Sequence, residues 1–177
     1  MGCWGITALE SDNGLDAVRC VRYNLPADGQ LDLGEMLERL KKDRWNAPCD
    51  VKLGCAHTSP MALAEIVVKY LDGDPGSLDY DEEWAAEDNK FRSITSFTAS
   101  RASLRELRDY LADTLKYARI RAERQIKAGG WFDPKDWDGW QKHMEGLIHR
   151  LDGVLALEGS KLELAHPPAP TVPELTM

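Results

Sequence analysis

The most apolar stretch of the chain lies in residues 59–71 and predicts a buried helix. Its only charged residues, Glu65 and Lys69, are four positions apart and share one stripe of a helix, whereas apolar side chains cover nearly all of the remaining surface. Ser59 can accept a hydrogen bond from first-turn amides, and Pro60 suits the first helical position. A helix that is apolar almost all round must be enclosed by other elements, so we expect it at the centre of the fold.

Four amphipathic segments predict the helices that enclose it. Apolar residues recur every three or four positions within residues 15–25, 33–40, 104–122 and 137–155. Each segment is bounded by residues that begin or end helices. Pro26 ends the first segment, Asp32 begins the second, Thr98 or Ser100 begins the third and Gly129 with Gly130 ends it, and Asp133 with Pro134 begins the fourth.

The chain is therefore expected to be mainly α, a single-domain bundle of about five helices. At 177 residues and 43% apolar it can bury a core without metals or disulfides. The near-alternation of residues 91–97 permits one short strand pair. We place the globular domain at residues 1–158 and expect residues 159–177, which are rich in proline, to form a flexible tail.

The N-terminus carries no secretory signal, and no apolar run reaches membrane-spanning length. Without a signal for export, the protein is expected to stay in the cytoplasm, which is a reducing compartment. The cysteines are then expected to be free thiols. They are Cys3, Cys20, Cys49 and Cys55.

Charge is distributed unevenly along the sequence. The formal net charge is −8, and residues 70–89 hold eight acids without a lysine or arginine, which leaves 22 acids and 22 bases elsewhere. Residues 101–127 show the opposite bias, with eight bases and four acids. The excess negative charge is therefore a local feature, and the molecule is dipolar in sequence.

The acidic stretch is the leading candidate for a partner-binding surface. Clustered carboxylates attract cationic partners, and proteins that hold nucleic acid carry cationic surfaces. Aromatic residues among the acids would add apolar contacts. A solvated loop that docks on the molecule's own basic helix is the equally weighted alternative. The candidate partner-binding residues are Asp72, Asp74, Asp79, Tyr80, Asp81, Glu82, Glu83, Trp84, Glu87 and Asp88.

The basic face of the third amphipathic segment is a candidate for contact with nucleic-acid phosphates. Acids interrupt that face and the chain as a whole is acidic, so direct binding should be weak and sensitive to salt. A solvated helix face with intrahelical ion pairs is the interpretation we favour. The possible contact residues are Arg105, Arg108, Arg119 and Arg124.

A small enzyme is the rival class of function. Cys55 lies two residues before His57, and Glu65 is a lone carboxylate, so the residue types of nucleophilic catalysis are present. Neither a Gly-x-Ser-x-Gly elbow nor a phosphate-binding glycine loop accompanies them. The structural alternative for Glu65 is an ion pair with Lys69 or with an arginine of a neighbouring element.

Metal sites are weaker candidates, and we expect no metal or cofactor. Cys49, Cys55 and His57 lack the close pairing of zinc ligands. Residues 72–83 place acids at the first, third and twelfth positions of a calcium loop, but Ser77 stands at the sixth position, where the sharp turn needs glycine.

Residues 1–16 combine a Met-Gly-x-Trp-Gly opening with an acidic cap before the first helix. The residues that carry this pattern are Gly2, Trp4, Gly5, Glu10, Asp12, Leu15 and Asp16. They resemble the opening of an uncharacterised bacterial domain-of-unknown-function family, from which the chain departs at Thr7, where the family has glycine, and at Leu9, where it has an aromatic residue. That family has no established activity, so the resemblance implies none.

By general character, the chain is similar to small, acidic, motif-poor proteins of mobile elements that inhibit host defence, anti-CRISPR proteins among them. We therefore hypothesise a non-catalytic interaction protein that binds a basic, nucleic-acid-handling partner through its acidic stretch. The most concrete form of this hypothesis is an inhibitor of a defence nuclease, such as a CRISPR effector.

Overall fold

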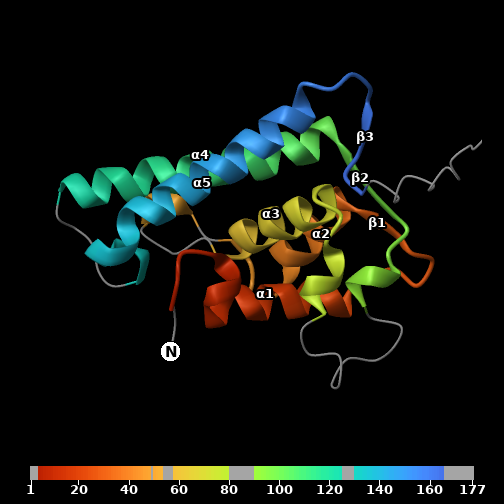
Figure 1. Cartoon of the computed structure of the whole chain (residues 1–177), viewed down its shortest axis with the longest axis horizontal. Helices are drawn as coiled ribbons and strands as arrows, with labels where there is room; N and C mark the ends of the chain where they lie inside the picture. Colours follow the sequence, from red (N-terminus) through yellow and green to blue (C-terminus); the bar gives the residue numbers. More distant parts are fainter. Residues whose placement is uncertain (1–3, 49, 54–57, 80–89, 125–129, 166–177) are drawn as a thin grey trace, which may run out of the picture.

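The computed structural model describes residues 4–48, 50–53, 58–79, 90–124 and 130–165. These parts of the chain form a mainly α fold with a small sheet, as the sequence predicts (Figure 1). The α-helices are α1 (Asp12–Tyr23), α2 (Leu33–Lys42), α3 (Thr58–Leu71), α4 (Arg101–Glu123) and α5 (Pro134–Leu155). The short 3-10 helices are η1 (Ala8–Glu10), η2 (Val51–Leu53), η3 (Pro75–Leu78), η4 (Phe91–Ser93) and η5 (Gly130–Phe132).

The predicted central helix is confirmed as α3. Every residue from Thr58 to Val67 is buried. The helix packs against η1, α1, α4 and α5, and Figure 1 shows it between α1 and the α4–α5 pair. It begins at Thr58, one residue before the expected cap, and ends at Leu71. Two residues later Gly73 has a φ of 72°, the left-handed conformation that favours glycine after a helix.

Local capping explains where the other helices begin. Ser11 accepts the Gly14 N–H at the start of α1, and Asp32 accepts the Glu35 N–H at the start of α2. Of the two residues considered for α4, Ser100 is the cap, whereas Thr98 lies in a strand. Asp133 caps α5 ahead of Pro134, as predicted. We expected α4 to end at Gly129 and Gly130, but in the structure it ends earlier, at Glu123.

The sheet differs from the predicted strand pair. It contains β1 (Gln30–Asp32), β2 (Ser96–Ser100) and β3 (Lys161–Glu163), in the order β1-β2-β3. β1 is parallel to β2, and β3 is antiparallel to it. Buried residues face each other in both pairs, Leu31 opposite Phe97 and Ala99 opposite Leu162. The expected strand at residues 91–97 starts later because its first residues form η4.

The packed part of the chain continues past residue 158, where the sequence places the start of the tail. Leu162, Leu164 and Ala165 are buried, and Leu164 donates its N–H to the Phe97 carbonyl at 2.7 Å. Leu162 lies in β3, and Leu164 and Ala165 follow it; all three belong to the core. Residues 166–177 lie outside the described part of the chain.

In the N-terminal segment, two glycines lie so close to other groups that a larger residue would collide with them. The segment contains η1, and Trp4 is 57% exposed. A Cβ on Gly14 would lie 1.7 Å from the Ala8 carbonyl oxygen, so only glycine lets η1 meet α1. A Cβ on Gly5 would collide with the carboxylate of Glu10.

No helix in the described ranges is long and apolar enough to cross a membrane.

Because α3 is enclosed, shortening one of its side chains should lower the free energy of unfolding considerably. Leu63 is fully buried, so Leu63→Ala should lower the free energy of unfolding by about 3 kcal/mol through lost burial and a residual cavity. The matched control is Leu157→Ala at a residue that is 54% exposed, for which we expect less than about 0.5 kcal/mol. Urea denaturation measures both, and equal losses would contradict a core centred on α3.

Candidate functional site

The described acids of the candidate partner-binding stretch have partners within the molecule. Asp72 pairs with Arg150 on α5 at 2.6 Å, and Asp74 pairs with Lys69 on α3 at 3.6 Å. The carboxylates of Asp72 and Asp74 remain about half exposed, whereas that of Asp79 is fully buried. The remaining candidates lie outside the described residues: Tyr80, Asp81, Glu82, Glu83, Trp84, Glu87 and Asp88.

Asp79 joins the two chain positions that flank these remaining candidates. Its Oδ1 accepts the Phe91 N–H at 2.8 Å and its Oδ2 accepts the Arg92 N–H at 3.2 Å. These amides begin η4, whose own N-cap residue, Lys90, provides no side-chain cap. Asp79 therefore caps η4 although it lies twelve residues before Phe91 in the sequence. A carboxylate satisfies the unpaired amides at a helix start and complements the helix dipole.

Two further buried side chains complete this junction. Arg22 of α1 donates to the Leu78 carbonyl at 2.9 Å, and its guanidinium lies 5.7 Å from the centre of the Phe91 ring. The Tyr70 hydroxyl of α3 donates to the Phe91 carbonyl at 2.6 Å. Burial, and secondarily the charge of Asp79, raises the pKa of Tyr70, so the hydroxyl keeps its proton and remains a donor.

We call Arg22, Tyr70, Leu78, Asp79 and Phe91 the Asp79 anchor. Leu78 and Phe91 are fully buried, and Arg22 and Asp79 are among the buried charged residues. The anchor holds residues 79 and 91 together against α1 and α3. It thus gives the acidic residues between these positions a fixed point of attachment.

Sequence reasoning missed Arg22 and Tyr70 and treated Asp79 as a surface acid. A signal was present for Arg22, because it lies four residues after Val18 and next to Val21, on the buried face of α1. A basic residue on an apolar face indicates a buried polar partner. The sequence gives no corresponding signal for the amides that Asp79 binds.

Glu65, the candidate catalytic carboxylate, lies at a second polar junction. It is buried and accepts the Ala8 N–H at 2.7 Å, the Leu9 N–H at 3.3 Å and a hydrogen bond with His143 Nε2 at 3.0 Å. The expected pair with Lys69 or an arginine is therefore wrong, since Lys69 pairs with Asp74. Its proposed companions Cys55 and His57 lie outside the described residues.

The geometry around Glu65 joins three elements. Two of the contacts of Glu65 come from backbone N–H groups, which can only donate, and the third joins its Oε2 to His143 Nε2. Two backbone amides and one imidazole occupy its oxygens, which links η1 and α5 to α3. Beside this junction, hydrogen bonds from the Thr7 amide and then the Thr7 hydroxyl lower the pKa of Glu10. Glu65 thus acts as a structural tie for the N-terminal segment.

Two arginines on the basic face of α4 pair with acids of α5. Arg108 pairs with Asp152 at 2.9 Å, and Arg119 pairs with Glu145 at 3.0 Å. These pairs cross between α4 and α5. Within α4, Arg108 also pairs with Asp109 at 3.4 Å, in line with the intrahelical pairs that the sequence suggested. Of the other candidate contact residues, Arg105 and Arg124 are exposed. The charges of Arg108 and Arg119 are thus directed towards the molecule's own acids.

Cys20 is a free, buried thiol that lies against Asp43. Hydrogen bonds from the Trp45 amide and from Asn46 lower the pKa of Asp43, which keeps that carboxylate charged. Burial, followed by the charge of Asp43, raises the pKa of Cys20 to about 11. A thiolate is therefore disfavoured here at neutral pH.

Alkylation of Cys20 should report this environment. The rate with iodoacetamide is expected to rise with pH until about 11, because the thiolate is the nucleophile. Asp43→Asn removes the negative charge while keeping an acceptor oxygen, so it should shift the profile to lower pH. Mass spectrometry of the Cys20 peptide measures the rate, with urea-unfolded protein as control, and an identical profile in folded and unfolded protein would refute the prediction.

Asp79→Asn should weaken the Asp79 anchor. An asparagine has one acceptor oxygen, so one of the Phe91 and Arg92 amides loses its partner, at a cost of about 1–3 kcal/mol in the free energy of unfolding. The exchange of these two amide hydrogens should accelerate. Asp74→Asn, at a side chain that is 58% exposed, is the matched control, with a change below about 0.5 kcal/mol. Equal stability of the two variants would show that the anchor contributes nothing.

Comparisons with models of protein families, with curated proteins and with solved structures found no match. The resemblance of the N-terminal residues to a bacterial family therefore stays a prediction. The function of the chain has to be inferred from its charges and contacts.

Proposed function

We propose that this chain is a non-catalytic, acidic interaction protein that binds a basic, nucleic-acid-handling protein. The observation that supports this most is the Asp79 anchor, which holds residues 79 and 91, on either side of the acids at positions 81–88, against buried residues of α1 and α3. Besides one base, Lys90, the sequence between these two residues has five acids. They are Asp81, Glu82, Glu83, Glu87 and Asp88.

The division of charge within the molecule favours binding by these acids. Arg150 and Lys69 already offset Asp72 and Asp74, and Asp79 is buried. The bases of α4 that could have neutralised the stretch are in part paired with α5, as Arg108 and Arg119 show. The acids of residues 81–88 therefore account for most of the net charge that a partner would meet.

The chemistry of a complementary partner points to a protein that binds nucleic acid. Such a protein presents lysines and arginines to phosphates, and a protein with clustered carboxylates can compete for the same surface. Binding would then block access of the nucleic acid. In its most concrete form the proposal is an anti-defence inhibitor of the anti-CRISPR type, acting on a nuclease.

The two rival functions gain less support. Glu65 is engaged by two amides and His143, which suits a structural tie better than a general base. Pairing of Arg108 and Arg119 with acids of α5 reduces the charge available to phosphates. A phosphate-binding or nucleic-acid-binding module would have to rely on the remaining exposed arginines.

Neutralising the acids should weaken binding without unfolding the protein. The test variant is Asp81→Asn, Glu82→Gln and Glu83→Gln together; Asp79 is left unchanged because it belongs to the anchor. Partners purified with the wild-type chain from its native cell are identified by mass spectrometry, and the dissociation constant of the purified complex is measured. We expect it to rise about tenfold or more and to depend strongly on salt.

A charge-matched control separates a local effect from the loss of net charge. Asp113→Asn, Glu123→Gln and Glu158→Gln remove the same charge from exposed residues of α4 and of the segment after α5. This variant should bind like wild type. A partner with no basic surface, or equal binding by the two triple variants, would refute the proposal.

A further inference from the structure

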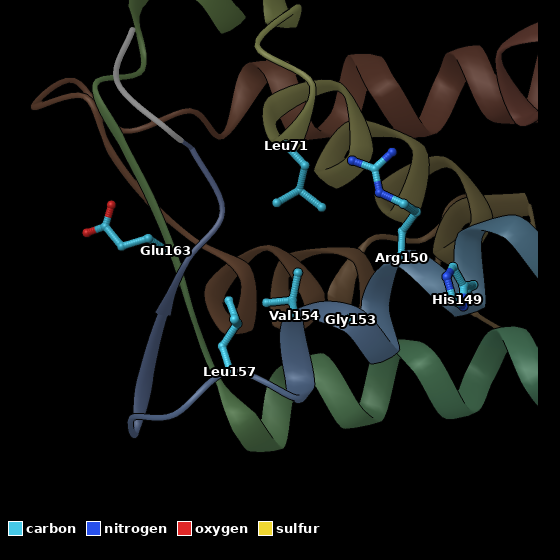
Figure 2. Close-up of a pocket in the computed structure, with 7 residues that line it drawn as sticks. All are labelled: Leu71, His149, Arg150, Gly153, Val154, Leu157 and Glu163. Carbon is cyan, nitrogen blue, oxygen red and sulfur yellow. The ribbon is translucent and has the colours of Figure 1, made fainter. Parts of the chain in front are cut away.

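A small pocket opens where the ends of α3 and α5 meet β3. Its volume is about 250 Å³. Figure 2 shows Leu71 at the end of α3 and Val154 on α5 pointing towards the same space, with Leu157 below them. The remaining lining residues are His149, Arg150, Gly153 and Glu163.

Leu71, Val154 and Leu157 form the apolar part of the wall around this space, whereas His149, Arg150 and Glu163 supply polar groups. Leu157 is 54% exposed and is among the few large apolar side chains of the described residues that are so accessible. Such a surface can bury an apolar side chain of another molecule without rearranging the core.

Gly153 creates part of the hollow. A Cβ placed on it would meet no atom within 4 Å, and the same is true of Gly146, two turns earlier on α5. Glycine is the least favourable residue in a helix interior after proline, and no close backbone approach requires it at either position. The space above Gly153 can thus be filled by substitution without a clash, which makes the pocket testable.

The pocket borders the acidic stretch. Arg150 lines it and donates to Asp72 Oδ1 at 2.6 Å, and Asp72 is the first acid of the stretch. Asp74 follows two residues later. A partner that brings basic residues to these carboxylates therefore comes within reach of Leu71, Val154 and Leu157.

The size of the pocket limits what can occupy it. Small-molecule and cofactor sites have volumes of about 300–1,000 Å³, so this one is smaller than that range. One apolar side chain is a better fit than a cofactor. The apolar wall supplies the burial, and the neighbouring carboxylates select basic residues beside the inserted side chain.

We propose that this pocket receives one apolar side chain, of the size of leucine, from the basic partner. The inference rests on the proposed function, since the acidic stretch brings the partner to this edge. It adds an apolar contact to an interface that charge alone would leave weak and sensitive to salt.

Two synthetic peptides can test the pocket. Each is a short peptide of lysines and arginines, with either leucine or alanine at its centre, and the full-length chain is titrated with both at low salt. Wild type should bind the leucine peptide about tenfold more tightly, as expected for one buried leucine side chain. Methyl NMR signals of Leu71, Val154 and Leu157 should shift with the leucine peptide only.

Gly153→Leu should fill the pocket and remove the preference for leucine, while the affinity for the alanine peptide stays the same. Gly146→Leu adds the same side chain to an open position of α5 outside the pocket and should keep the preference. Both replacements favour the helix, so thermal unfolding should show no loss of stability. Equal binding of the two peptides by wild type would refute the proposal that the pocket receives a leucine side chain. A preference for leucine that persists in Gly153→Leu would also refute it.

The acidic triple variant separates this inference from the proposed function. If wild type shows no preference for leucine while the triple variant no longer binds the alanine peptide, the charge-based function is supported and the pocket is refuted. If the variant binds both peptides as wild type does and the preference for leucine persists, the pocket stands and the charge-based function fails.

Discussion

The enclosure of α3 is the constraint on which the rest of the structure depends. Its residues from Thr58 to Val67 are all buried, so every polar group on this helix must find its partner on another element. Glu65 meets this requirement with η1 and α5, and Tyr70 meets it with η4. The same helix that forms the core therefore fixes the N-terminal segment at its middle and the base of the acidic stretch near its end.

Local chemistry allowed much of the fold to be predicted, because caps and periodicity act over a few residues. Ser11, Asp32 and Asp133 cap their helices as their sequence context indicates, and the apolar stretch of α3 is central. The sheet could not be foreseen, since β1 has only three residues and pairs with a strand far along the chain. A pattern of period two cannot be read in so short a segment.

The candidate site was less predictable, because its contacts join residues that are distant in sequence. Asp79 reads as one of eight similar acids, and only its burial against the amides of Phe91 and Arg92 separates it from the others. His143 lies 78 residues from Glu65 and shares no motif with it. The charges of α4 show the same limit, since the partners of Arg108 and Arg119 lie on a helix that only the fold brings alongside.

The structure thus separates carboxylates that support the fold from those available to a partner. Burying an ionised group is costly unless hydrogen bonds and charges compensate it, and Asp79 and Glu65 each receive at least two backbone amides. Asp72 and Asp74 are half exposed, and their ion pairs with Arg150 and Lys69 contribute little stability. Under the proposed function, a cationic partner would exchange these surface pairs for its own at small cost, whereas the Asp79 anchor would stay intact. Binding at the acidic surface would then vary independently of folding.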